Sequence, residues 1–136
     1  MNLRLEHARR LLAKAREDEY VLKHLADDPR APDAPLGFHA QQAVEKALKA
    51  VLAAHGVEYP LTHNLAMLAA ALAEANCGAP PDAADLPRLT PFGVALRYDE
   101  EGEPSDVELE RPWVVSCVGR TLAWADAKIA ATGEGA

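Results

Sequence analysis

The stretch that decides the fold is residues 37–55, which read GFHAQQAVEKALKAVLAAH. Its apolar residues recur at steps of three and four, the spacing that places side chains on one face of an α-helix. The predicted core face consists of Phe38, Ala43, Ala47, Leu48, Val51 and Leu52. Gly56 follows directly, and glycine readily takes the left-handed conformation that ends helices. The sequence therefore predicts an amphipathic helix over Gly37–His55.

Two further helices are predicted on either side of this one. Apolar residues at helical spacing indicate a helix over Leu3–Ala26, and three prolines in residues 29–35 predict a surface loop after it. Thr62 is a suitable N-cap for a helix over His63–Ala75. Because the connection from Gly56 to Thr62 is short, we expect this third helix to lie antiparallel to the second.

The C-terminal part of the chain predicts one weak helix and one strong helix. Pro87 and Pro91 interrupt a helical pattern over Ala83–Tyr98, so a broken helix is expected there. The last helix is predicted to begin at a capping box, residues 105–108, and to be kinked at Pro112 about two turns later. It should end near Ala131, so that residues 1–131 form the domain and residues 132–136 a disordered tail.

Composition supports an all-α fold in a single domain. Of the 136 residues, 49% are hydrophobic but only 5% are aromatic, because alanine and leucine supply most of the apolar content. Both residues favour helices over strands. The net charge of −7 argues against broad, charge-driven binding of nucleic acid.

Several other classes of protein are disfavoured by what the sequence lacks. The two cysteines form no CxxC pair, and the five histidines show no metal-binding spacing, so neither a metal nor a cofactor is predicted. No apolar run has the length of a membrane span, and the N-terminal residues do not resemble a secretory signal. We therefore expect a soluble, cytoplasmic protein without a membrane partner.

A polar stripe beside the core face of residues 37–55 is the first candidate site. His39, Gln42, Lys46 and Lys49 follow one another at steps of three, four and three, so they lie in line on one helix face. Such groups could hold a phosphate or the edge of a base. The alternative is structural: Glu45 and Lys49 pair on a solvated face, while His39 and Gln42 form hydrogen bonds within the bundle. Spacing alone favours this alternative.

A resemblance to a known protein family favours a functional role for this stripe. Residues 38–49 (FHAQQAVEKALK), Gly56-Val57, residues 60–65 (PLTHNL) and Arg97-Tyr98 together resemble the signature of HEPN-domain proteins. The resemblance implies an up-and-down bundle of four or five helices, usually a homodimer, often encoded beside a minimal nucleotidyltransferase in a toxin–antitoxin-type system. A nucleotide or RNA is the implied ligand. The ligand-binding residues would be His39, Gln42, Lys46, Lys49, His63, Arg97 and Tyr98.

The resemblance also provides a test for catalysis. Active HEPN ribonucleases carry an Arg and a His separated by four to six residues, but Arg97 is followed at those positions by Gly102, Glu103 and Pro104. No histidine occurs after His63, so the ribonuclease pair is missing. Three hypotheses remain: an accessory partner of a nucleotidyltransferase, a divergent metal-independent endoribonuclease toxin using Arg97 with His39 or His63, and a non-catalytic oligomeric adaptor.

Overall fold

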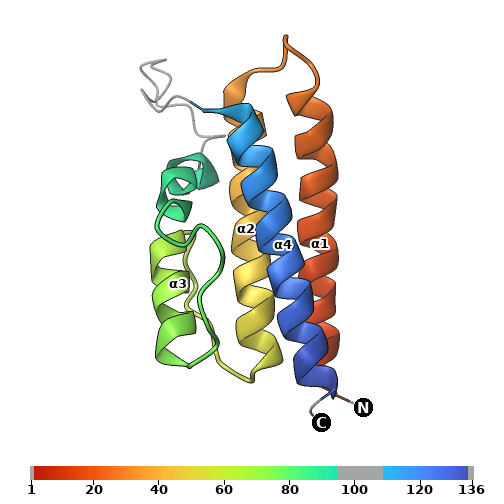
Figure 1. Ribbon diagram of the computed structural model, residues 1–136, viewed down its shortest axis with the longest axis vertical. Coiled ribbons are helices and arrows are strands. Elements are labelled where there is room, and N and C mark those ends of the chain that lie inside the picture. The colour runs from red at the N-terminus through yellow and green to blue at the C-terminus, as the bar shows by residue number, and fades with distance from the viewer. Residues whose placement is uncertain (1, 95–108, 135–136) are drawn as a thin grey trace.

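A computed structural model describes residues 2–94 and 109–134 of the protein (Figure 1). Within these ranges the chain is helical and contains no strand, which confirms the all-α helical bundle. The elements are α1 (Leu3–Ala26), α2 (Asp33–Ala54), α3 (Leu65–Glu74), the 3-10 helix η1 (Leu86–Val94) and α4 (Arg111–Glu134). None of the helices in the described part is both long and apolar enough to span a membrane.

Helix α2 is the central element of the bundle. It contacts α1, α3, η1 and α4, and Figure 1 shows α3 and η1 along its side away from α1. Its predicted core residues from Ala43 to Leu52 are buried, whereas Phe38 is only half-buried. Alanines provide much of this burial, because small side chains let neighbouring helices approach α2 closely. The core faces predicted for α3 and α4 are also buried: Leu65, Leu68, Leu72, Val114, Val118, Leu122, Ala125 and Ile129.

The direction of α3 differs from the prediction. The connection after α2 returns along that helix, and this brings the His63 carbonyl within hydrogen-bonding distance of the Gln41 side chain, which donates to it. Helix α3 therefore begins beside the middle of α2 and runs in the same direction as α2, so the antiparallel prediction is wrong (Figure 1). The alternation of an up-and-down bundle applies to α1 and α2, whereas the connection after α2 returns along the bundle before α3 begins.

Two helix starts also differ from their predicted positions. Helix α2 begins at Asp33, before Pro35, because a proline in the first turn lacks only an N–H that has no partner within the helix. The N-cap of α3 is Asn64 and not Thr62, since the Asn64 side chain accepts a hydrogen bond from the Met67 amide at 3.2 Å. The end of α2 agrees with the sequence, because Gly56 has a φ of +73°.

The C-terminal prediction is correct in part. The proline-rich segment forms the 3-10 helix η1 with Pro91 inside it, as expected of an interrupted helix. Helix α4 begins at Arg111, so Pro112 lies in its first turn and the predicted kink two turns into the helix is wrong. The same helix continues to Glu134, beyond the predicted end at Ala131, so residues 132–134 are helical where a tail was expected. The predicted capping box lies outside the described residues.

Arg111 joins the first turn of α4 to the connection between α1 and α2. Its guanidinium donates hydrogen bonds to the backbone carbonyls of Leu25, Asp28 and Ala31, and it pairs with Asp33 at 3.0 Å. The side chain is 23% exposed. These charge-assisted bonds hold the first turn of α4 against the end of α1 and the connection that follows it.

Candidate polar site

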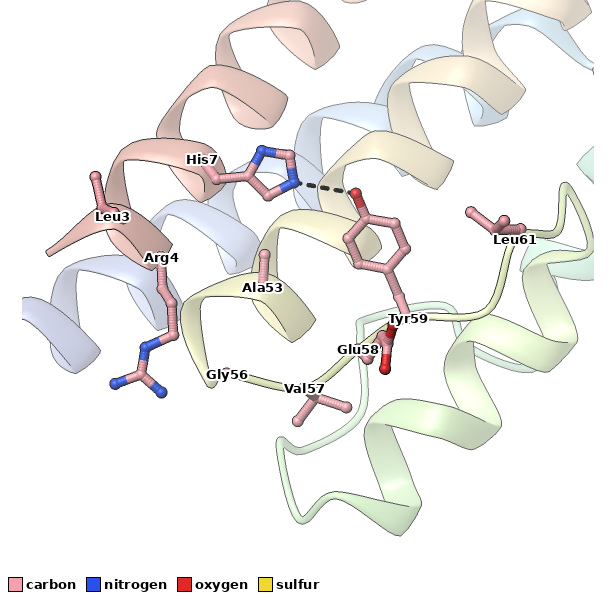
Figure 2. A pocket seen from close by; sticks show the side chains of 9 residues that line it. All are labelled: Leu3, Arg4, His7, Ala53, Gly56, Val57, Glu58, Tyr59 and Leu61. Carbon is pink, nitrogen blue, oxygen red and sulfur yellow. Dashed lines mark hydrogen bonds between the residues drawn. The ribbon is translucent and has the colours of Figure 1, made fainter.

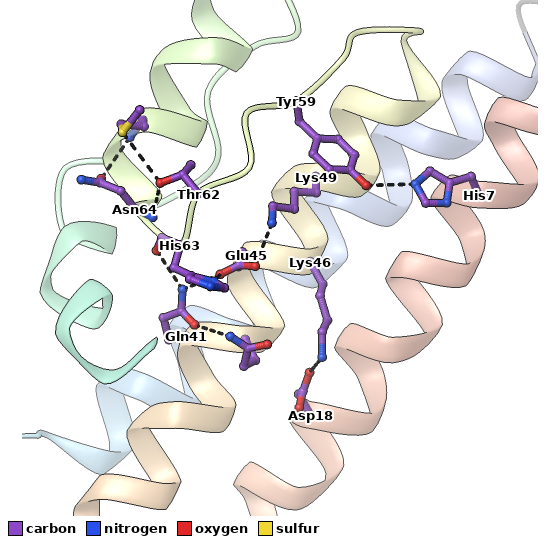
Figure 3. A network of polar contacts seen from close by, with 12 residues as sticks. His7, Asp18, Gln41, Glu45, Lys46, Lys49, Tyr59, Thr62, His63 and Asn64 are labelled. Carbon is purple, nitrogen blue, oxygen red and sulfur yellow. Dashed lines mark hydrogen bonds and ion pairs between the residues drawn. The ribbon is translucent and has the colours of Figure 1, made fainter. Parts of the chain in front are cut away.

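One face of the bundle carries a network of polar side chains (Figure 3). It lies where α1, α2 and the connection between α2 and α3 meet. We call it the polar network, and its members are Asp18, His39, Gln41, Gln42, Glu45, Lys46, Lys49 and His63. Two buried carboxylates organise it, one from α1 and one from α2.

Asp18 is the carboxylate from α1. One of its oxygens accepts from the Lys46 ammonium at 2.6 Å, and the other lies 3.0 Å from Nδ1 of His39. Asp18 is 8% exposed, whereas the Lys46 and His39 side chains are 27% and 28% exposed. The carboxylate therefore lies beneath two groups that still reach the solvent.

Glu45 is the carboxylate from α2, and it is 5% exposed. One oxygen accepts from Gln41 at 2.9 Å and lies 2.7 Å from Nδ1 of His63; the other accepts from Lys49 at 2.9 Å. Burial by itself raises the pKa of Glu45, but the hydrogen bonds from Gln41, Lys49 and His63 outweigh it and lower the pKa below its usual value. Glu45 is therefore ionised at neutral pH.

The stripe predicted from the sequence lies on one face, but its residues are not free. His39 and Lys46 bind Asp18, Lys49 binds Glu45, and Gln42 donates to the Gln41 side chain at 2.8 Å. The Glu45–Lys49 pair of the structural alternative exists, although it is buried and not solvated. The connection after α2 brings His63 to the same face. Arg97 and Tyr98 lie outside the described residues, so their place in the site stays a prediction.

Sequence reasoning missed Asp18. Its signal is positional: Asp18 lies three residues after Ala15 and four before Leu22, in the buried stripe of α1. A charged residue in that stripe requires a partner, because an unpaired buried charge is very costly. Gln41, which is fully buried, occupies a comparable position on α2 and was missed for the same reason.

The geometry defines what this face can do chemically. When an ionised carboxylate accepts the Nδ1 proton of a histidine, the other ring nitrogen is left as an acceptor and a base. His63 is 61% exposed, so this nitrogen can be reached from solvent. Lys46 retains ammonium donors that Asp18 does not use. In the described part of the chain, no group of histidine, cysteine and acidic residues could hold a metal ion.

The structure therefore defines a class of protein: an all-helical bundle with polar groups of its central helix gathered on one face. The family model described as HEPN domain matches residues 8–126. The chain belongs to the HEPN family, as its sequence motifs indicated. Neither the curated proteins nor the solved structures contain a match to it.

Proposed function

We propose that this HEPN-domain protein is the accessory partner of a small nucleotidyltransferase in a two-component system of the toxin–antitoxin type. It acts as a homodimer, and the polar network contacts a nucleotide. The observation that supports the proposal is the position of Lys46, His39 and His63, which are held by buried carboxylates but reach the solvent.

The electrostatics of the polar network limit the kind of ligand. Lys46 and Lys49 are each balanced by a carboxylate, so the network is close to neutral when its histidines are neutral. A long polyanion gains little from such a surface, in agreement with the net charge of −7. A single nucleotide fits better, because it carries far fewer phosphate groups than RNA and adds base and ribose edges that bind neutral donors and acceptors.

Nucleotide binding tests the site. We expect calorimetric titration with ATP to show binding that Lys46→Ala weakens roughly tenfold, which corresponds to one charge-assisted hydrogen bond. Lys14→Ala is the matched control, because Lys14 is 68% exposed on α1 and outside the polar network. Equal loss in both variants, or no binding to the unaltered protein, would remove the site assignment.

The partner is tested separately. The untagged protein should co-purify with a nucleotidyltransferase encoded by the adjacent gene, and light scattering should give the mass of a dimer. Failure of co-purification would contradict the partnership without affecting the nucleotide site.

One observation favours the ribonuclease hypothesis as a second candidate. The Glu45–His63 pair provides an oriented and exposed imidazole of the kind used in general acid–base catalysis. If the protein cleaves RNA, its expression should arrest growth, and both Arg97→Ala and His63→Ala should abolish the arrest. Growth arrest that survives His63→Ala would exclude His63 as the base.

The adaptor hypothesis predicts no ligand, and it would be favoured if His39, Lys46 and Arg97 lay on unrelated faces; Arg97 lies outside the described residues. His39 and Lys46 instead meet at the same carboxylate, Asp18, which counts against it.

A further inference from the structure

Apart from the polar network, the protein has an open hollow beside the N-terminal end of α1 and the C-terminal end of α2 (Figure 2). Its volume is about 570 Å³, within the range of roughly 300–1,000 Å³ that is typical of small-molecule sites. Small residues leave room for it, because Ala53 and Gly56 line it where larger side chains would fill the space. We call it the terminal cavity, and its lining residues are Leu3, Arg4, His7, Ala53, Gly56, Val57, Glu58, Tyr59 and Leu61.

One wall of the terminal cavity is aromatic. His7 and Tyr59 are joined by a hydrogen bond of 3.0 Å between Nε2 and the hydroxyl, and their ring planes differ by 16°. The ring centroids are 6.2 Å apart, so the two nearly parallel rings are offset from one another and do not overlap directly. Figure 2 shows the two aromatic side chains next to each other in the lining of the cavity. Two nearly parallel aromatic rings in one lining favour a planar aromatic ligand, which can stack on their faces.

A positive charge and apolar side chains complete the terminal cavity. The exposed guanidinium of Arg4 lies against Gly56, at which a Cβ atom would collide with it. Leu3 and Leu61 are 70% and 97% exposed and lie at opposite ends of the lining (Figure 2), so a ligand that covers either of them would remove apolar surface from water. Glu58 is the acidic group of the lining, and it opposes the charge of Arg4.

The polar network adjoins this cavity but does not overlap with it. The Lys49 ammonium lies 5.5 Å from the centroid of the Tyr59 ring, and no member of the polar network lines the cavity. Tyr59 thus lies between the two sites: the Lys49 ammonium of the polar network lies over its ring, and the same residue lines the cavity together with His7.

We propose that the terminal cavity binds a planar aromatic molecule that carries one anionic group. The ring packs against His7 and Tyr59, the anionic group pairs with Arg4, and Leu3 and Leu61 border the site at its two ends. This site is independent of the nucleotidyltransferase partnership and of the polar network.

Naphthoate is a suitable probe, because it combines a planar ring system with a carboxylate. We expect equilibrium dialysis against the full chain to show binding of naphthoate at least tenfold tighter than that of naphthamide, which lacks the charge, or cyclohexanecarboxylate, which lacks the planar ring. In NMR spectra, the amides of Gly56 and Val57 should shift. Equal affinity for naphthoate and either analogue, or shifts confined to other residues, would overturn the proposal.

Variants of the lining separate the two interactions. Arg4→Met keeps the aliphatic stem and should reduce the preference for naphthoate over naphthamide to near unity. Tyr59→Leu should weaken both ligands about equally, because it removes an aromatic ring and keeps apolar bulk. Glu58→Gln should tighten naphthoate binding severalfold, since it removes an opposing charge. Lys14→Ala is the control, and circular dichroism verifies the fold of each variant; unchanged binding in folded Arg4→Met and Tyr59→Leu would refute the site.

Discussion

Replacing Glu45 by glutamine should lower the free energy of unfolding by about 2–3 kcal/mol at neutral pH. Glu45 is 5% exposed and accepts from three groups, Gln41, Lys49 and His63. A glutamine of the same size has a single acceptor oxygen, so its NH₂ group must face one of these donors. A hydrogen bond to a charged group contributes roughly 1.5–3 kcal/mol, which sets the scale of the loss.

The full cost of an orphaned buried charge, about 3–5 kcal/mol, is not expected here. The Lys49 side chain is 13% exposed, and its long stem allows the ammonium to reach water when its partner is neutral. This relief keeps the estimate near the value of a single charge-assisted bond.

The pH dependence provides an independent check on the same change. The pKa of Glu45 in the folded protein is lowered from 4.5, so the carboxylate contributes stability that is present above pH 4.5 and disappears as the pH falls through its folded-state pKa. The stability difference between the natural protein and Glu45→Gln should therefore shrink below pH 4.5.

Urea denaturation monitored by circular dichroism measures both effects. Glu17→Gln is the matched control, because Glu17 is 69% exposed and pairs with Lys14 at 3.5 Å, so its loss should change stability by less than about 0.5 kcal/mol. A Glu45→Gln variant as stable as Glu17→Gln, or a difference that grows in acid, would refute the account of Glu45.

Three further substitutions and one labelling experiment have defined expectations. Gly37→Ala should destabilise the protein by about 1–3 kcal/mol, because a Cβ atom there would collide with the Phe92 ring. Gly119→Ala should stabilise it by roughly 0.5–1 kcal/mol, since the nearest atom to the added Cβ, a Glu19 carboxylate oxygen, is 3.8 Å away. Urea denaturation measures the sign of both changes. Arg111→Met should lower stability by about 2–3 kcal/mol and reduce the melting temperature, because it removes the charge-assisted hydrogen bonds from the guanidinium to the Leu25, Asp28 and Ala31 carbonyls. Burial raises the pKa of Cys117 to about 11, so iodoacetamide should label it only in denaturant; mass spectrometry showing rapid labelling of the folded protein would contradict this.

Local patterns in the sequence predicted the helices well and their directions less well. Apolar spacing identified α1 with its observed bounds and the buried faces of α3 and α4. It gave no information on the path of residues 56–64, because an extended segment of that length reaches roughly 30 Å and can return along a helix. The direction of α3 depends on tertiary contacts such as the bond from Gln41 to the His63 carbonyl.

The candidate site shows a similar division. Helical spacing placed His39, Gln42, Lys46 and Lys49 in one stripe, and Figure 3 shows Lys46 and Lys49 of that stripe beside their carboxylate partners. Their partners depend on which helix packs against that stripe, which spacing on α2 cannot reveal. Asp18 could have been suspected only by treating a charge within an apolar repeat as a residue that needs a partner.

The burial of Asp18 in α1 has a further consequence. Apart from Asp18, the buried residues of α1 are leucines and alanines, and apolar contacts alone oppose a slip of α1 along α2 less strictly than a paired charge does. Any such slip would strand the Asp18 carboxylate among apolar side chains, away from Lys46 and His39. The buried charge of Asp18 thus specifies the register in which α1 packs against α2.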